Sequence, residues 1–276
     1  MRTNFFQLLT QKSLDPQKEY ETLWFLFFEE KSVSTYYSMR TVAKHIDDNY
    51  FRKLPFRGSF ASLNNMMEAL DLYKRSAIDI EKLFVFCELL FAVMFDQKAN
   101  DYAHPMREQR TTILSNISHI LDKTNHEFQK DAEGRWIIVE KNQAATMAAQ
   151  LVTDPVVAFD LIEYNHFTIK GHLAEKKAIL VSIAGYIEPI LNSKTLSSAG
   201  YKQLESDAGF IFNNFHIRHN NKEGSKANDY IATISNNELE EWYDKAYELA
   251  LSVIIINDYL SIGKDIADVK PKYTWR

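Results

Sequence analysis

The chain has 276 residues, of which 46% are hydrophobic and 25% are charged, with a formal net charge of -5 and a pI near 5.9. The apolar content excludes disorder as a description of the whole chain, and the length allows one large core or two moderate ones. The acidic balance disfavours a protein that coats nucleic acid with its whole surface, but it leaves room for a local basic site. With 8 Gly and 6 Pro, the chain has too few turn residues for an all-β fold.

The single cysteine, Cys87, excludes an internal disulfide and a zinc site built from several cysteines. The first residues, MRTNFFQLLTQKSLDPQ, lack the apolar core of a secretory signal, so we expect a cytoplasmic protein. The sequence contains no phosphate loop, dinucleotide fingerprint, Gly-x-Ser-x-Gly elbow or His-Glu-x-x-His helix. We therefore expect no cofactor and no metal site.

Apolar residues recur at helical spacing in the first half of the chain, which predicts a helix that begins near Pro16 and another over about 33–51. Residues 83–95, LFVFCELLFAVMF, are apolar nearly all round, but as a helix they span only about 20 Å of the ~30 Å hydrocarbon core. They predict a central buried helix, and we expect no membrane association. Glu88 is the only charge in this segment. It either pairs in the interior or points outward, and we favour the outward orientation.

A further helix is predicted from His104 to about Lys123, after which the hydrophobic period changes. The segments HEFQ and RWIIVE alternate polar and apolar residues around the turn KDAEG, which predicts a β-hairpin near residues 127–140. We expect an all-α helical bundle with this one small hairpin. The hairpin also marks the expected division into an N-terminal helical region, 1–141, and a C-terminal helical bundle, 142–276, which could share one core.

The C-terminal half carries long apolar stripes. Helices are predicted over 143–151, over 156–162 and over a long segment that ends near Leu191. Ser235 and Glu238 have the spacing of a capping box at the start of a final long helix. Such stripes pack as an antiparallel bundle, and the apolar surface that remains suggests a homodimer.

Residues 207–222, DAGFIFNNFHIRHNNK, concentrate more polar chemistry than any other stretch. Leu204, Ala208, Ile211 and Phe215 predict one apolar helix face, and the same spacing continues it into Arg218 and His219. Imidazole, guanidinium and amide groups at this density favour proton transfer or ligand binding. The alternative is a structural helix end, in which the cations cap carbonyl groups. The candidate catalytic residues are His216, Arg218 and His219, and the candidate binding residues are Asn213, Asn214, Asn220, Asn221 and Lys222.

The order of three segments resembles a known family. The helix AEKKAILVSIAGYIEPIL, then the motif, then ELEEWYDKAYELALSVIIINDYL resemble the C-terminal half of HEPN-like helical domains of bacterial abortive-infection and antiviral defence proteins, over about residues 155–262. The usual motif of that family is an Arg followed four to six residues later by a His, whereas Arg218 directly precedes His219 here. The resemblance implies a metal-independent endoribonuclease or defence effector whose site forms across a dimer.

Two functional hypotheses follow. In the catalytic one, His219 is the acid and base, Arg218 holds the phosphate, and His216 or Asn214 orients the reacting groups, because RNA supplies its own 2′-hydroxyl nucleophile. In the other, a non-catalytic helical module binds RNA or a partner protein through His216, Arg218 and His219.

Overall fold

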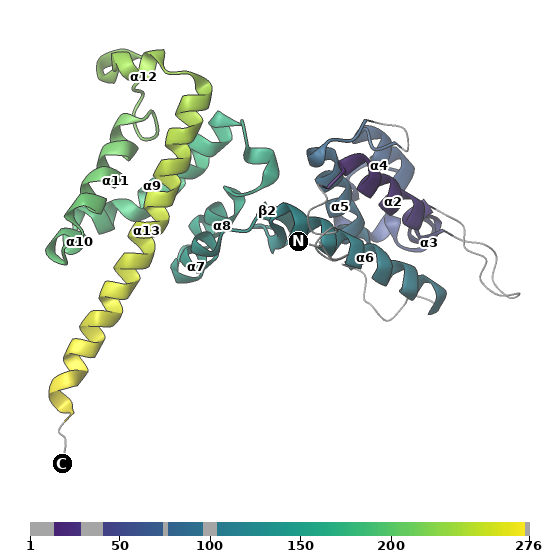
Figure 1. Cartoon of the computed structure of the whole chain (residues 1–276), viewed down its shortest axis with the longest axis horizontal. Helices are drawn as coiled ribbons and strands as arrows, with labels where there is room; N and C mark the ends of the chain where they lie inside the picture. Colours follow the sequence, from purple (N-terminus) through teal and green to yellow (C-terminus); the bar gives the residue numbers. More distant parts are fainter. Residues whose placement is uncertain (1–13, 29–40, 74–76, 96–103, 274–276) are drawn as a thin grey trace, which may run out of the picture. The chain divides into compact units, whose positions relative to one another are not determined.

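The computed structural model describes residues 14–28, 41–73, 77–95 and 104–273. Helices make up most of these residues, and the only sheet among them has two strands, β1 (His126–Lys130) and β2 (Trp136–Glu140) (Figure 1). This confirms the expected all-α fold with one small hairpin. None of the described helices is long and apolar enough to cross a membrane.

The chain divides into two compact units at the hairpin. The first unit contains Met1–Phe128 and Arg135–Ile138, and the second contains Gln129–Gly134 and Val139–Arg276. The division therefore falls within a few residues of the boundary expected at 141/142. The hairpin contributes residues to both units, and its turn belongs with the second.

The first unit is built from five described α-helices around an aromatic core. Tyr20 and Phe86 are fully buried with ring centroids 4.5 Å apart, and Trp24 lies against both rings. The helix expected over 33–51 is described only over Val42–Asn49 (α3), and residues 33–40 lie outside the described part of the chain. The helices are α2 (Pro16–Phe28), α3 (Val42–Asn49), α4 (Leu63–Ala69), α5 (Ile80–Phe95) and α6 (His104–Thr124), with short 3-10 turns η1 (Phe51–Lys53) and η2 (Pro55–Arg57).

Helix α5 is the central buried helix that the sequence predicts, but the orientation we favoured for Glu88 was wrong. The Ile138 N–H donates to Glu88 Oε1 at 2.6 Å, so this carboxylate faces strand β2. A carboxylate that accepts a backbone N–H avoids the cost of an unpaired polar group in an apolar setting. Cys87 is fully buried and burial raises the pKa of its thiol, which fits its expected role as a core residue.

The hairpin consists of β1 (His126–Lys130) and β2 (Trp136–Glu140). Gly134 has φ +76°, a left-handed conformation that glycine adopts without the steric cost of a Cβ atom. On the first unit's side, Phe128 stacks on Phe91 with ring centroids 3.9 Å apart. A two-stranded ribbon is marginal by itself, so this packing against α5 supplies the support it needs.

The second unit is a helical bundle with one continuous apolar core. Its long helix α13 packs against α7, α9 and α11 (Figure 1). Helices begin where the sequence predicts: Asn142, Asp154 and Ser235 each accept a backbone N–H as N-caps. The helices are α7 (Gln143–Leu151), α8 (Pro155–Glu163), α9 (Leu173–Asn192), α10 (Thr195–Ser198), α11 (Lys202–Asn214), α12 (Asp229–Thr233) and α13 (Asn236–Val269), with 3-10 turns η3 (Phe167–Ile169), η4 (Gly224–Lys226) and η5 (Lys270–Lys272).

Candidate functional site

Helix α11 ends five residues before His219, the last position that periodicity suggested. Its last residue is Asn214, and the Phe215 N–H donates to the Ile211 carbonyl at 3.0 Å. Arg218 and His219 therefore do not continue its apolar face, as we had expected, but lie in the loop that follows. The Arg218 N–H reaches back to the Phe212 carbonyl at 3.2 Å, which closes the end of the helix.

The turn that ends the helix is formed by His216, which has φ +59°. This left-handed conformation is usual for Gly at a helix end and costs other residues roughly 1–2 kcal/mol. Asn221 holds it in place: it is buried, and its Oδ1 accepts the His216 N–H at 2.9 Å. Its carbonyl also accepts the Asn228 N–H at 2.8 Å. Asn221, a candidate binding residue, thus fixes the loop from inside.

A basic cluster forms between this loop and α9, and we define it as Lys177, His216 and Lys222. The Nζ of Lys177 lies 3.2 Å from His216 Nε2. Burial, followed by the charge of Lys222, lowers the pKa of Lys177. Burial and then the charges of Lys177 and Lys222 lower the pKa of His216, an effect that the His219 carbonyl and Glu223 only partly oppose. His216 is therefore neutral at pH 7, and Nε2 accepts from the ammonium group.

Arg218 points to a different part of α9 from His216. Its guanidinium lies 2.5 Å from Glu188 Oε1 and donates to Asn213 Oδ1 at 3.3 Å. Lys177 and Glu188 are eleven residues apart, which is about 16 Å along a helix. The structure therefore separates the side chains of His216 and Arg218, and a carboxylate compensates the charge of Arg218.

Arg218 also lines a cleft of about 530 Å³ between α9, α10 and α11. On its far side, Glu205 is buried and accepts hydrogen bonds from Lys194 Nζ at 2.8 Å and the Ser197 N–H at 3.1 Å. The hydrogen bond from Lys194 is the main reason why the pKa of Glu205 is lowered. Each of the two carboxylates that line this cleft, Glu188 and Glu205, is thus paired with a cation.

The remaining candidate residues lie on the outside of the loop. Asn214 is exposed and donates to the Phe210 carbonyl at 2.8 Å within its own helix. Asn220 Oδ1 accepts the N–H groups of Lys222 and Glu223, both at 3.3 Å, and so shapes the turn. The His219 side chain is partly exposed, and no hydrogen bond or ion pair joins it to another residue of the described chain.

An aromatic surface surrounds the start of the loop, and the sequence analysis did not identify it. Phe215, which directly precedes His216, has its ring centroid 4.4 Å from that of Trp242, 6.0 Å from Phe210 and 6.3 Å from Tyr230. Phe210 is 58% exposed and Tyr230 is 48% exposed. We call Phe210, Phe215, Tyr230 and Trp242 the aromatic surface, although Phe215 at its centre is buried and only 4% exposed. These residues come from three helices and the loop, so no single periodic pattern in the sequence predicts that they lie together.

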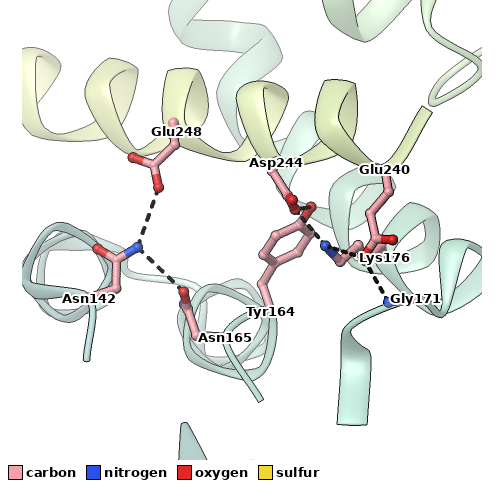
Figure 2. A network of polar contacts seen from close by, with 8 residues as sticks. All are labelled: Asn142, Tyr164, Asn165, Gly171, Lys176, Glu240, Asp244 and Glu248. Atoms are coloured by element: carbon pink, nitrogen blue, oxygen red, sulfur yellow. Dashed lines mark hydrogen bonds and ion pairs between the residues drawn. The ribbon is translucent and has the colours of Figure 1, made fainter. Parts of the chain in front are cut away.

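The N-terminal part of α9 is anchored by a polar network around Lys176, also absent from the sequence predictions. Figure 2 shows Lys176 between the carboxylates of Glu240 and Asp244, which project from α13. Lys176 Nζ lies 2.9 Å from Glu240 Oε1 and 2.6 Å from Asp244 Oδ1, and the lysine is only 5% exposed. The Gly171 N–H also donates to Glu240 Oε1, at 2.7 Å.

The same network extends to α8 through aromatic groups. The Tyr164 hydroxyl donates to Asp244 Oδ1 at 2.8 Å, and Lys176 Nζ lies 5.2 Å from the centre of its ring. Tyr164 stacks on Tyr247 with centroids 4.1 Å apart, and burial raises the pKa of both hydroxyls. Because Lys176 fixes how α9 is rotated against α13, it also determines where the next residue, Lys177, points.

No family model matches the chain, and no curated protein or solved structure was found to be similar to it. The fold and the site define its class only as a two-unit helical protein with a basic loop beside an aromatic surface.

Proposed function

We propose that the second unit is an RNA-binding helical module. The observation that supports this most is the basic cluster, in which Lys177 Nζ lies 3.2 Å from His216 Nε2. Burial and then the charge of Lys222 lower the pKa of Lys177, and no carboxylate is ion-paired with either lysine within the described residues. Like charges held together in this way are unfavourable until an anion joins them. An RNA phosphate is such an anion, and it would accept hydrogen bonds from both ammonium groups.

The aromatic surface supports RNA over a simple anion. Proteins that bind single-stranded nucleic acid combine a basic groove with exposed rings on which bases stack. Phe210 and Tyr230 are exposed, and both contact Phe215 beside the cluster.

The experiment is fluorescence anisotropy with labelled single-stranded RNA, competed by inorganic polyphosphate and single-stranded DNA. Tyr230→Ala should weaken binding several-fold, whereas Phe25→Ala, another exposed aromatic in the first unit, should not. Equal competition by polyphosphate would contradict base stacking.

A metal-independent ribonuclease remains the second proposal, and the partly exposed His219 side chain favours it because this imidazole is free for proton transfer. The compensated charge of Arg218 makes binding without cleavage the better-supported function. We therefore expect purified protein to bind RNA and leave it intact, as seen on denaturing gels with end-labelled RNA. If cleavage occurs, His219→Ala should lower the cleavage rate by ~10² or more without lowering the melting temperature. That result would favour the ribonuclease proposal over RNA binding alone.

RNA affinity should rise as the pH falls from about 7.5 to 5.5. His216 is neutral at pH 7 because its pKa is lowered, and a phosphate favours its charged form, so protonation and RNA binding reinforce each other. Because the pKa of His216 is lower in the folded state than in the unfolded state, its neutral form favours folding at a pH above the unfolded-state pKa. This contribution to stability is lost as the pH falls. His216→Asn keeps a residue that tolerates φ +59° and should abolish most of the pH dependence. The measurement is anisotropy at constant ionic strength. A pH profile that is unchanged in His216→Asn but flattened in His219→Ala would assign the titration to His219 instead.

A further inference from the structure

The last turns of α13 carry an apolar seam that no other part of the described chain covers. Residues 261–273 are all exposed, and Figure 1 shows α13 continuing past α10 and α11 toward the C-terminus. A shallow groove runs along the same residues. We define the seam as Tyr259, Ile262, Ile266 and Val269, which are 64%, 50%, 50% and 49% exposed.

The spacing of the seam is three, four and three residues. At about 100° per residue, Tyr259 to Val269 fall within an arc of roughly 80°, which is the narrow stripe of a two-stranded coiled coil and not the broad face of a bundle helix. Apolar side chains at this spacing favour a second helix of matching periodicity. Exposed apolar surface of this kind marks an interaction site.

The charges beside the seam identify the second helix as another copy of this chain. In a parallel pair in which Tyr259 and Ile266 occupy the a positions of the heptad, the residue just before Ile266 lies opposite the residue five positions later in the other helix. Here these residues are Asp265 and Lys270, which carry opposite charges. Lys270 keeps helical backbone angles, φ -48° and ψ -45°, so it continues the stripe.

Two-fold symmetry forms the Asp265 to Lys270 contact twice, with no like charges opposed. An antiparallel pair would place Asp265 against its own copy. We propose that the chain forms a parallel homodimer through the seam, with Asp265 of each copy facing Lys270 of the other. The seam spans only about one and a half heptads, which is a short contact, so the dimer is weak and depends on concentration.

Sedimentation velocity of the 276-residue chain from about 1 to 300 μM tests this inference independently of RNA binding. The wild type should shift from monomer to dimer over this range, and Ile262→Ser/Ile266→Ser should raise the dissociation constant at least ~10-fold. Because both isoleucines are half exposed, the helical circular dichroism should be unchanged. Lys264→Glu, on the opposite side of α13, is the matched control and should have no effect.

A charge exchange tests the orientation. Asp265→Lys and Lys270→Asp should each weaken the dimer several-fold, and the double variant Asp265→Lys/Lys270→Asp should restore it. A wild type that stays monomeric at every concentration overturns the proposal. A dimer whose affinity the double variant fails to restore also overturns it. If instead Asp258→Lys and Lys272→Asp each weaken the dimer and their combination restores it, the pair is antiparallel and the proposal is wrong.

Discussion

Replacement of both lysines of the basic cluster, Lys177→Gln/Lys222→Gln, should lower the affinity for single-stranded RNA by about 10–100-fold at about 0.1 M salt. Each ammonium group that contacts a phosphate releases counterions, so the slope of log K against log salt should also fall by about 1.4 for two lost contacts. Fluorescence anisotropy at several salt concentrations measures both quantities.

The control changes the net charge by the same amount at another place. Lys202→Gln/Lys264→Gln removes two exposed lysines from α11 and α13 that lie outside the basic cluster. Affinity and salt slope should stay close to the wild type. The melting temperature of the Lys177→Gln/Lys222→Gln protein should not fall, because the change removes a repulsion between like charges. If both double variants lose the same affinity, binding depends on overall charge and the proposed site is wrong.

The second large effect concerns stability. Lys176→Met should destabilise the second unit by about 2 kcal/mol, with a fall in its melting temperature of about 4–8 °C. The methionine retains the packing of the stem but leaves two carboxylates without their shared cation. The effect stays below the usual cost of breaking a buried ion pair, because the Asp244 side chain is 52% exposed and solvent compensates part of its charge. Thermal and urea unfolding followed by circular dichroism measure this change.

The neighbouring lysine provides the matched control. Lys177→Met is the same substitution one residue away, at a side chain that carries no ion pair within the described residues, and it should change stability far less. Asp244→Asn in the Lys176→Met background should recover part of the loss, because it removes a carboxylate that has lost its cation. Equal destabilisation by Lys176→Met and Lys177→Met would contradict the role assigned to the Lys176 network.

Some elements could be predicted from neighbouring residues alone. Ser235 lies three residues before Glu238, and in the structure its side chain accepts the Glu238 N–H at 3.2 Å. The hairpin was visible because the side-chain period changed around Gly134, which supplies the turn. Caps, turns and periodic stripes depend on residues within a few positions of each other, so the sequence records them directly.

The end of α11 shows where local reasoning failed. Helical spacing continued through Arg218 and His219, yet the helix stops at Asn214. The stop depends on His216 in a left-handed conformation, which Asn221 holds from five residues away. No local pattern marks His216 as the stop, because a histidine usually avoids that conformation. The sequence therefore showed which segment contains the candidate residues, but the directions of their side chains could not be predicted.

The sequence by itself determined that this protein is helical with one hairpin, where most helices begin, and which segment concentrates polar side chains. Only the tertiary structure decided which charges are buried and which are available. Lys176 and Lys177 are adjacent and chemically identical, but the packing of α9 on α13 places the first between two carboxylates and the second beside His216. The reason is physical: helical periodicity fixes the angle between neighbouring side chains, whereas the partner that each one meets comes from a distant part of the chain. For Lys176 it lies on a helix more than sixty residues away, and for Lys177 in a loop 39 residues away.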